Sequence, residues 1–273
     1  TGLWALLLLA LVQGADAAQR LRIVSLAPSL TELAYAAGAG DAMVGTVEYS
    51  DYPAAARALP RVGDAWNVDA EAVLALRPDL VLSWPSGTPA GTVARLRSLG
   101  VEVVEIPTFR LVDVATALRS VGRIAGTEAV AEGAARRYEI EIRDLRASHL
   151  GVRRVDVFIE IDDEPLYTVN GRHVISEVVD LCGGRNVFAD LPQLAPPVAI
   201  EAVLAHDPDV ILSTDDTTSD PAALWRRWSG LKAVKAGSIY SMSSDTLTRS
   251  TPRLAVGAGE VCAALDDARR RLK

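Results

Sequence analysis

The sequence predicts an α/β protein of two similar lobes, each built on a mostly parallel sheet, with a ligand cleft between them. Three observations support this fold class: a duplicated helix–strand unit, alternating strand and helix patterns, and one long helical segment between the two copies. A chain of 273 residues with 49% hydrophobic residues is long enough to bury two cores.

A segment of the chain occurs twice, at residues 68–83 and 198–213. Ten of the 16 aligned positions are identical, and two more exchange one aliphatic residue for another. Each copy predicts a short helix ended by a proline, then an aspartate and a buried strand. Helix–Pro–Asp–strand order can recur by chance, but chance does not also pair Glu71 with Glu201. We therefore infer a duplicated lobe, and two lobes imply a cleft.

The first half of the chain alternates strand and helix patterns around the first copy of the repeat. This alternation predicts a parallel sheet with helices on both faces. The expected strands are residues 22–26, 43–46 and 101–106, and the expected helices are residues 30–37, 93–99 and 112–124.

Residues 127–150 contain no proline, and their apolar residues recur at helical spacing. About 22 residues of helix would extend about 33 Å. One more surface helix of the first lobe is the alternative, but a position between the two repeats favours a helix that joins the lobes. We therefore expect lobes at residues 18–126 and 151–273. Because a single rigid helix is a poor hinge, we expect lobe closure to be small.

The second lobe restarts with a predicted strand at residues 154–159 and repeats a helix of the first lobe. Thr31-Glu32-Leu33 matches Ser176-Glu177-Val178, and we expect Thr31 and Ser176 to cap their helices. The offset between the halves falls from 145 at this helix to 130 at the repeat, so the first lobe carries an insertion at residues 48–67. Aromatic residues in such a loop are candidates for lining a site, and the insertion contains Tyr49, Tyr52 and Trp66.

The start of the chain predicts export. An apolar run, Leu3 to Val12, precedes the small residues Ala15 and Ala17, which indicates a signal peptide at residues 1–17. A membrane anchor would need about 20 apolar residues. The net charge of −7 argues against nucleic acid and anionic membrane surfaces as partners. We expect a monomer.

Two cysteines remain in the chain, Cys182 and Cys262. In an exported protein an even count favours one disulfide, whereas in the cytosol they would stay buried thiols.

The sequence lacks the motifs of the common cofactor and nucleotide sites and shows no nucleophile elbow. Its three histidines, His149, His173 and His206, are scattered over different elements, and we expect them on the surface. We therefore expect no resident cofactor, no metal site and no enzyme.

Several of the remaining aromatic and polar residues follow the ends of predicted strands in the sequence. Trp84 directly follows the repeat strand, and ligands of open α/β sheets bind at the carboxyl ends of strands; core packing is the alternative. Trp225 and Trp228 are three residues apart on an expected amphipathic helix, which favours packing. A predicted strand at residues 238–241 leads into a polar loop, where Asp245 and Arg249 either hydrogen-bond a ligand or form a local ion pair.

Across the whole mature chain, these features resemble the periplasmic vitamin B12-binding proteins of bacterial cobalamin importers. The Glu and Pro-Asp elements of the repeat are shared with siderophore and haem receptors. The segments that carry the resemblance are residues 25–33, 49–53, 182–188 and 244–253 and both Glu-x-Val-Leu-Ala-x-x-Pro repeats.

The resemblance implies two Rossmann-like lobes joined by one long helix, with cobalamin or a related corrinoid carried between them in the periplasm. It further implies delivery of this ligand to the permease dimer of an inner-membrane ABC transporter. Glu71 and Glu201 would dock on arginines of that permease; capping of their own helices is the alternative. Cys182 and Cys262 fall where the family has its disulfide. By resemblance the corrin packs on Tyr49, Trp66 and Trp84, and the second-lobe contact loop is Asp245, Thr246, Leu247, Thr248 and Arg249.

Two positions depart from the family pattern, because Ala195 and Thr246 stand where aromatic residues are expected. Half of the apolar contact that the second lobe would make with the ligand is therefore missing. This leaves a different corrinoid or another tetrapyrrole as alternative ligands. A haem or ferric-siderophore receptor is the alternative within the same class. A two-lobed periplasmic enzyme would need paired carboxylates or a nucleophile facing the cleft, and the sequence shows no such set.

Overall fold

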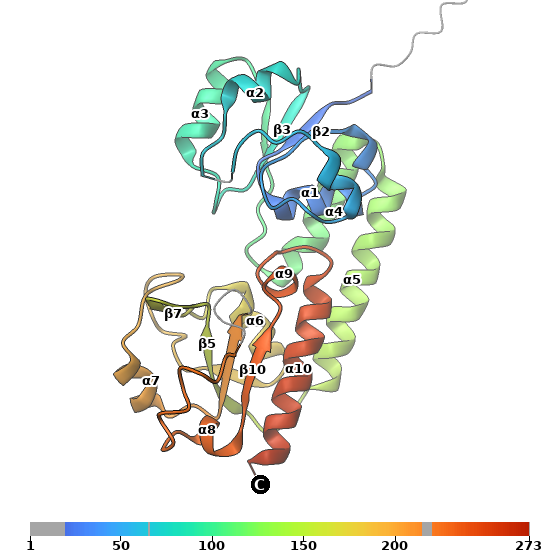
Figure 1. The fold of residues 1–273 in the computed structure, drawn as a ribbon. Helices are drawn as coiled ribbons and strands as arrows, with labels where there is room; N and C mark the ends of the chain where they lie inside the picture. The colour runs from blue at the N-terminus through green and yellow to red at the C-terminus, as the bar shows by residue number, and fades with distance from the viewer. Residues whose placement is uncertain (1–19, 65, 215–219, 273) are drawn as a thin grey trace, which may run out of the picture.

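The computed structural model of the protein describes residues 20–64, 66–214 and 220–272. They form two α/β lobes, with helices α5 (Glu128–Ser148) and α10 (Leu254–Arg271) packed along one side of the molecule (Figure 1). The predicted signal peptide, residues 1–17, lies outside the described part of the chain. Within that part, no helix is both long and apolar enough to cross a membrane.

The first lobe contains a parallel four-stranded sheet in the order β2-β1-β3-β4. Its strands are β1 (Ile23–Ser25), β2 (Met43–Gly45), β3 (Leu80–Ser83) and β4 (Val103–Glu105). Its helices are α1 (Pro28–Ala36), α2 (Ala70–Ala75), α3 (Ala90–Ser98) and α4 (Leu111–Ala125), with short 3-10 turns η1 (Gly40–Ala42) and η2 (Ala54–Ala58).

The second lobe repeats this plan with a parallel sheet in the order β10-β9-β5-β8, which confirms the predicted fold class. Its strands are β5 (Val155–Glu160), β8 (Gly184–Asn186), β9 (Val210–Thr214) and β10 (Ile239–Met242), beside a small hairpin of β6 (Asp162–Asp163) and β7 (Leu166–Tyr167). Its helices are α6 (Val174–Leu181), α7 (Ile200–His206), α8 (Lys232–Ala236), α9 (Ser244–Leu247) and α10.

The duplicated sequence is also a duplicated structure, because each copy forms a helix, a proline turn and a central strand. The aspartate after each proline has the same task. Asp79 accepts from the backbone N–H of Arg22 at 2.8 Å, and Asp209 accepts from that of Asp156 at 3.0 Å. Each aspartate also donates its own N–H to the carbonyl of the same partner. The repeated Pro-Asp pair therefore sets the register of the strand against its neighbour.

Two carboxylates at matching positions of the equivalent helices α1 and α6 join the lobes. Glu32 of α1 is 2% exposed and accepts hydrogen bonds from Thr251 Oγ1 at 2.6 Å and from two nitrogens of Arg253 at 2.7 and 2.8 Å. Its mate on α6, Glu177, accepts from the backbone N–H of Leu111 at 2.9 Å. Each lobe thus gives one carboxylate to the other.

One hydrophobic core runs through both lobes and includes residues of β1, α1, α4, α5, β5, α6 and α10. The Cys182–Cys262 disulfide is present in this core and joins the end of α6 to α10 across a sequence separation of 80 residues. A shared core and the Glu32 and Glu177 contacts oppose large movements of one lobe against the other.

Three local expectations were wrong. Thr31 and Ser176 do not cap helices, because α1 and α6 begin earlier than predicted, after Ala27 and His173. The polar loop after β10 instead forms helix α9. The segment around Trp225 forms turns rather than an α-helix. Trp225 is nevertheless fully buried against Phe158, with ring centroids 5.6 Å apart, so the expected packing role is confirmed.

We expect Glu32→Ala to lower the free energy of unfolding by about 3 kcal/mol, because Arg253 and Thr251 lose their shared buried acceptor. Glu177→Ala should cost only about 1 kcal/mol, since its charged partner Arg110 is exposed. Urea unfolding of both variants measures the difference. Equal losses would show that the buried Glu32 contact is no stronger than its exposed counterpart.

A buried carboxyl in the second lobe predicts a pH effect on stability. Glu160, at the end of β5, is 1% exposed and accepts from Trp225 Nε1 at 2.6 Å and Ser213 Oγ at 3.1 Å. Burial raises the pKa of this carboxyl to about 7, from 4.5 in the unfolded chain. Its protonation therefore stabilises the fold fully below about pH 4.5, and that stabilisation is lost as pH rises through about 7.

The glutamine of Glu160→Gln stays neutral, so the variant does not lose this stability. The difference in unfolding free energy between Glu160→Gln and the parent protein should therefore rise by about 2 kcal/mol, in favour of the variant, as the pH increases from about 5.5 to about 8. Urea unfolding at both pH values gives this difference, in which the contributions of all other titrating groups cancel. If the difference between the two proteins does not change with pH, Glu160 is ionised in the folded state throughout.

Candidate functional site

A cavity of about 400 Å³ lies between the lobes, where the carboxyl ends of strands from both sheets meet. The amino ends of α1 and α6, which are equivalent helices of the repeat, both border it. Trp84 follows β3, Thr108 follows β4 and Thr214 ends β9. The lining residues are Ala27, Pro28, Ser29, Trp84, Thr108, Ile161, His173, Ile175, Thr214, Thr248, Arg249 and Ser250.

A tight turn after β3 holds Trp84 at this cavity. The Trp84 backbone N–H donates to Thr88 Oγ1 at 3.0 Å, and its carbonyl accepts from the N–H groups of Gly87 and Thr88. The indole ring lies against Gly87, where a Cβ atom would approach the ring to 2.2 Å. Glycine is therefore required beside the ring. The strand-end interpretation of Trp84 agrees with this position, and the ring is partly rather than fully buried.

Arg249 connects the two lobes at the edge of the cavity. Its guanidinium forms ion pairs with Asp51 of the first lobe at 2.9 Å and with Asp245 at 2.7 Å. The Arg249 guanidinium contributes to holding the pKa of Asp51 below its usual value. The local ion pair of Asp245 and Arg249, which was the alternative to a ligand contact, is therefore present, together with a bridge to the other lobe. Beside it, Arg253 lies over the ring of Tyr52 at 4.1 Å.

His173 faces the same cavity, although we expected all three histidines on the surface. It precedes α6, and its Nδ1 accepts from the backbone N–H of Ile175 at 3.2 Å. Burial lowers the pKa of His173 to about 4, so the ring is neutral at physiological pH. His149 also departs from the expectation, with a side chain only 10% exposed beside Asp266, while His206 is exposed. The equivalence of α1 and α6 could have indicated His173, because Pro28 holds the same place in the first lobe.

The insertion of the first lobe displays two large aromatic side chains. Tyr49 is 78% and Trp66 is 70% exposed. Tyr49 has a left-handed backbone conformation with φ of 63°, next to Ser50, whose hydroxyl is buried and accepts from Thr46 Oγ1 at 2.7 Å. Asp64 accepts from the backbone N–H of Trp66 at 2.7 Å, which fixes the turn that presents the indole.

The predicted aromatic residues do not all line the same cavity. Trp84 lines the cavity between the lobes, whereas Trp66 borders a groove of about 490 Å³ beside α2 and α3. In the predicted contact loop, Thr248 and Arg249 line the cavity and Asp245 binds Arg249. Thr246 and Leu247 are not among the lining residues. Leu247 is 1% exposed and packs in the core, because α9 turns its side chain inward.

The two acidic mates of the repeat are exposed on α2 and α7, which lie toward the far ends of the two lobes, away from α5 (Figure 1). Asp69 caps α2 by accepting from the N–H groups of Glu71 and Ala72, and no side chain caps α7. Glu71 and Glu201 lie in the first turns of α2 and α7, where the helix dipole favours a carboxylate, so stabilisation of their own helices stays the alternative to docking.

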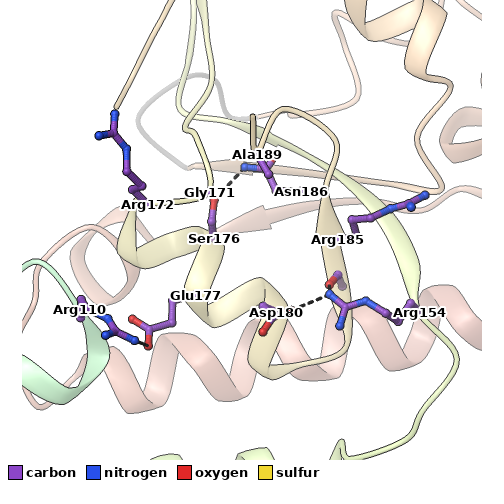
Figure 2. Close-up of a pocket in the computed structure, with 11 residues that line it drawn as sticks. Arg110, Arg154, Gly171, Arg172, Ser176, Glu177, Asp180, Arg185, Asn186 and Ala189 are labelled. Carbon is purple, nitrogen blue, oxygen red and sulfur yellow. Dashed lines mark hydrogen bonds and ion pairs between the residues drawn. The ribbon is translucent and has the colours of Figure 1, made fainter. Parts of the chain in front are cut away.

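A second hollow, of about 500 Å³, is lined mostly by the second lobe and by four arginines, of which Arg110 comes from the first lobe (Figure 2). The guanidinium groups have partners: Arg110 pairs with Glu177, Arg154 with Asp180 and Arg185 with Asp156, and Arg172 donates to the carbonyl of Pro192. Because these contacts occupy the guanidinium groups of the second hollow, we place the candidate site in the cavity between the lobes. Among the described residues, no three His, Cys, Asp or Glu side chains form a group that could hold a metal ion.

Comparison with known proteins agrees with this architecture. Residues 23–246 match the family model described as periplasmic binding protein. The vitamin B12-binding protein of Vibrio cholerae is 36% identical over 251 residues, which cover 92% of this chain and 91% of the relative.

Two solved structures are similar over nearly the whole chain. The periplasmic vitamin B12 binding protein BtuF of Vibrio cholerae has a TM-score of 0.84 at 36% identity and covers 91% of this chain and 97% of its own. The periplasmic haem-binding protein RhuT from Roseiflexus sp. RS-1 has a TM-score of 0.80 at 25% identity and covers 91% of this chain and 98% of its own. The two lobes, the long joining helix and these matches show that the chain belongs to the periplasmic binding protein family.

Proposed function

We propose that this protein captures cobalamin or a closely related corrinoid between its lobes in the periplasm and delivers it to an ABC transporter. The similarity to vitamin B12-binding proteins over more than nine-tenths of the chain carries this proposal. The corrinoid is cargo and not a resident cofactor, and the protein acts as a carrier rather than an enzyme. Within this proposal, residues 18–126 and 151–273 act as lobes around the helix at residues 127–150.

The exposed aromatic side chains support a large, flat, apolar ligand. Tyr49 and Trp66 present aromatic surface to solvent on the first-lobe insertion, and Trp84 presents its ring inside the cavity. One aromatic side chain buries about 150–250 Å² when a ligand covers it, so these rings offer a large apolar contact area. We propose that the corrin contacts these three rings, with Asp245, Thr248 and Arg249 on the opposite side.

Haem is the alternative ligand, and its support is the fold similarity to haem-binding proteins. The carboxylates of haem favour an unpaired cation, but Arg249, the arginine among the described lining residues, already pairs with two aspartates. If His173 Nε2 bound the haem iron, the proton of the neutral ring would move to Nδ1. Nδ1 could then no longer accept the backbone N–H of Ile175. Both observations favour a corrinoid.

We expect the wild-type protein to bind cyanocobalamin tightly in isothermal titration, and Trp66→Ala to weaken binding about tenfold or more, because one ring contact is lost. Val256→Ala removes another exposed apolar side chain, on α10, and serves as the control that should bind like the wild type. Tight haem binding without detectable heat from any corrinoid would refute the proposed ligand.

We further propose that Glu71 and Glu201 are the contacts with the two permease subunits. Both are exposed carboxylates at matching positions of the repeat, one on each lobe, which suits a partner with two equivalent subunits. Charges at the edge of an interface set orientation and association rate, and salt screens them.

The double variant Glu71→Ala/Glu201→Ala should keep its affinity for cyanocobalamin and lose at least about tenfold in affinity for the transporter at low salt. Each single variant should lose less. Glu141→Ala, on the exposed face of α5, is the matched control. Pull-down with the transporter in detergent measures this effect, and a double variant that binds the transporter like the wild type contradicts the docking role.

A further inference from the structure

Three residues that line the cavity between the lobes carry polar donors without a hydrogen-bond partner in the described part of the chain. Among the described residues, Thr108 Oγ1 and Trp84 Nε1 are buried without a hydrogen-bond partner. Thr108 is only 3% exposed, yet it is one of the residues that line the cavity. A buried donor without a partner costs free energy, and a ligand group that accepts from it recovers that cost.

His173 adds a third donor, and the structure determines which of its nitrogens carries the proton. Nδ1 accepts the N–H of Ile175, so the proton of the neutral ring is on Nε2. In the described part of the chain, no hydrogen bond engages Nε2, and the side chain lines the cavity. Burial keeps the pKa of this ring at about 4, so the donor stays uncharged in the periplasmic pH range.

The charges around these donors select against an anionic acceptor. Among the described residues that line the cavity, Arg249 is the cation, and it is paired with Asp51 and Asp245, which leaves this group of three side chains with one net negative charge. The carbonyl oxygen of a neutral amide can accept from the donors. A carboxylate could accept as well, but it would bring a second negative charge to a cavity bordered by a group whose net charge is already negative.

We propose that His173, Thr108 and Trp84 form a neutral donor site that binds the carboxamide groups at the rim of the ligand and discriminates against carboxylates. This inference rests on the proposed function, because a corrin carries carboxamide side chains where haem carries carboxylates. It assigns His173 and Thr108 to the binding site and gives Trp84 a polar role in addition to its ring contact.

The test separates the donor of His173 from its structural role before α6. His173→Asn keeps a side chain that caps helices well but is too short to replace Nε2 in the cavity. Thr108→Val removes the hydroxyl and keeps the side-chain shape. We expect each variant to fold with an unchanged circular dichroism spectrum and to bind cyanocobalamin about tenfold more weakly in isothermal titration.

Two controls complete the experiment. His206→Asn, on the outer side of the second lobe where the ring contacts Phe188, should bind like the wild type. Cobalamin derivatives with one side-chain amide hydrolysed to a carboxylate should bind the wild type more weakly than cobalamin does, at least for the isomer whose acid enters this site. That preference should shrink in the His173→Asn/Thr108→Val double variant.

If both single variants fold and bind cyanocobalamin like the wild type, the donor site is refuted while the proposed function stands. Equal affinity of cobalamin and of every monocarboxylate isomer for the wild type would also refute it. If the wild type binds no corrinoid at all, the proposed function itself fails, and this result is recognised before any variant is measured.

Discussion

The contact between Glu32 and the pair Thr251 and Arg253 is the constraint on which the cleft depends. A buried carboxylate with three charge-assisted or hydroxyl hydrogen bonds tolerates little displacement, because each donor would be left without its partner. It fixes the start of α10 against α1, and Arg253 in turn lies on the ring of Tyr52. The insertion of the first lobe and the Arg249 region of the second are thereby held at a set distance.

The same contact explains how a molecule with duplicated lobes avoids a free hinge. Glu177 repeats the role of Glu32 in the reverse direction, and the shared core with α5 and α10 fills the space between the two contacts. Ligand binding to such a frame requires little ordering of the protein, so a cavity between the lobes is nearly preformed for its ligand.

Charge pairing determines the character of the cavity more than its shape does. Arg249 is held between Asp51 and Asp245, and His173 is kept neutral by burial, so the polar groups that remain available are uncharged donors. A ligand with a neutral polar rim and a flat apolar face is complementary to this arrangement and to the exposed rings of Tyr49 and Trp66.

Sequence alone was sufficient for the two-lobed fold, the long helix, the disulfide and the position of Trp84, because these follow from local patterns: a repeat, helical periodicity, cysteine count and the end of a strand. Residue patterns did not reveal His173 as a cavity residue, and the family resemblance placed Leu247 in the contact loop although it lies in the core. Both depend on how α6 and α9 pack against elements distant in the chain.

The pairing of Glu32 with Arg253 and of Arg249 with Asp51 joins residues about 200 positions apart. Local sequence carries no signal for such pairs, since a carboxylate inside a helix looks the same whether it faces solvent or another lobe. Only the packing of the two lobes decides which charges are neutralised and which polar groups remain for a ligand.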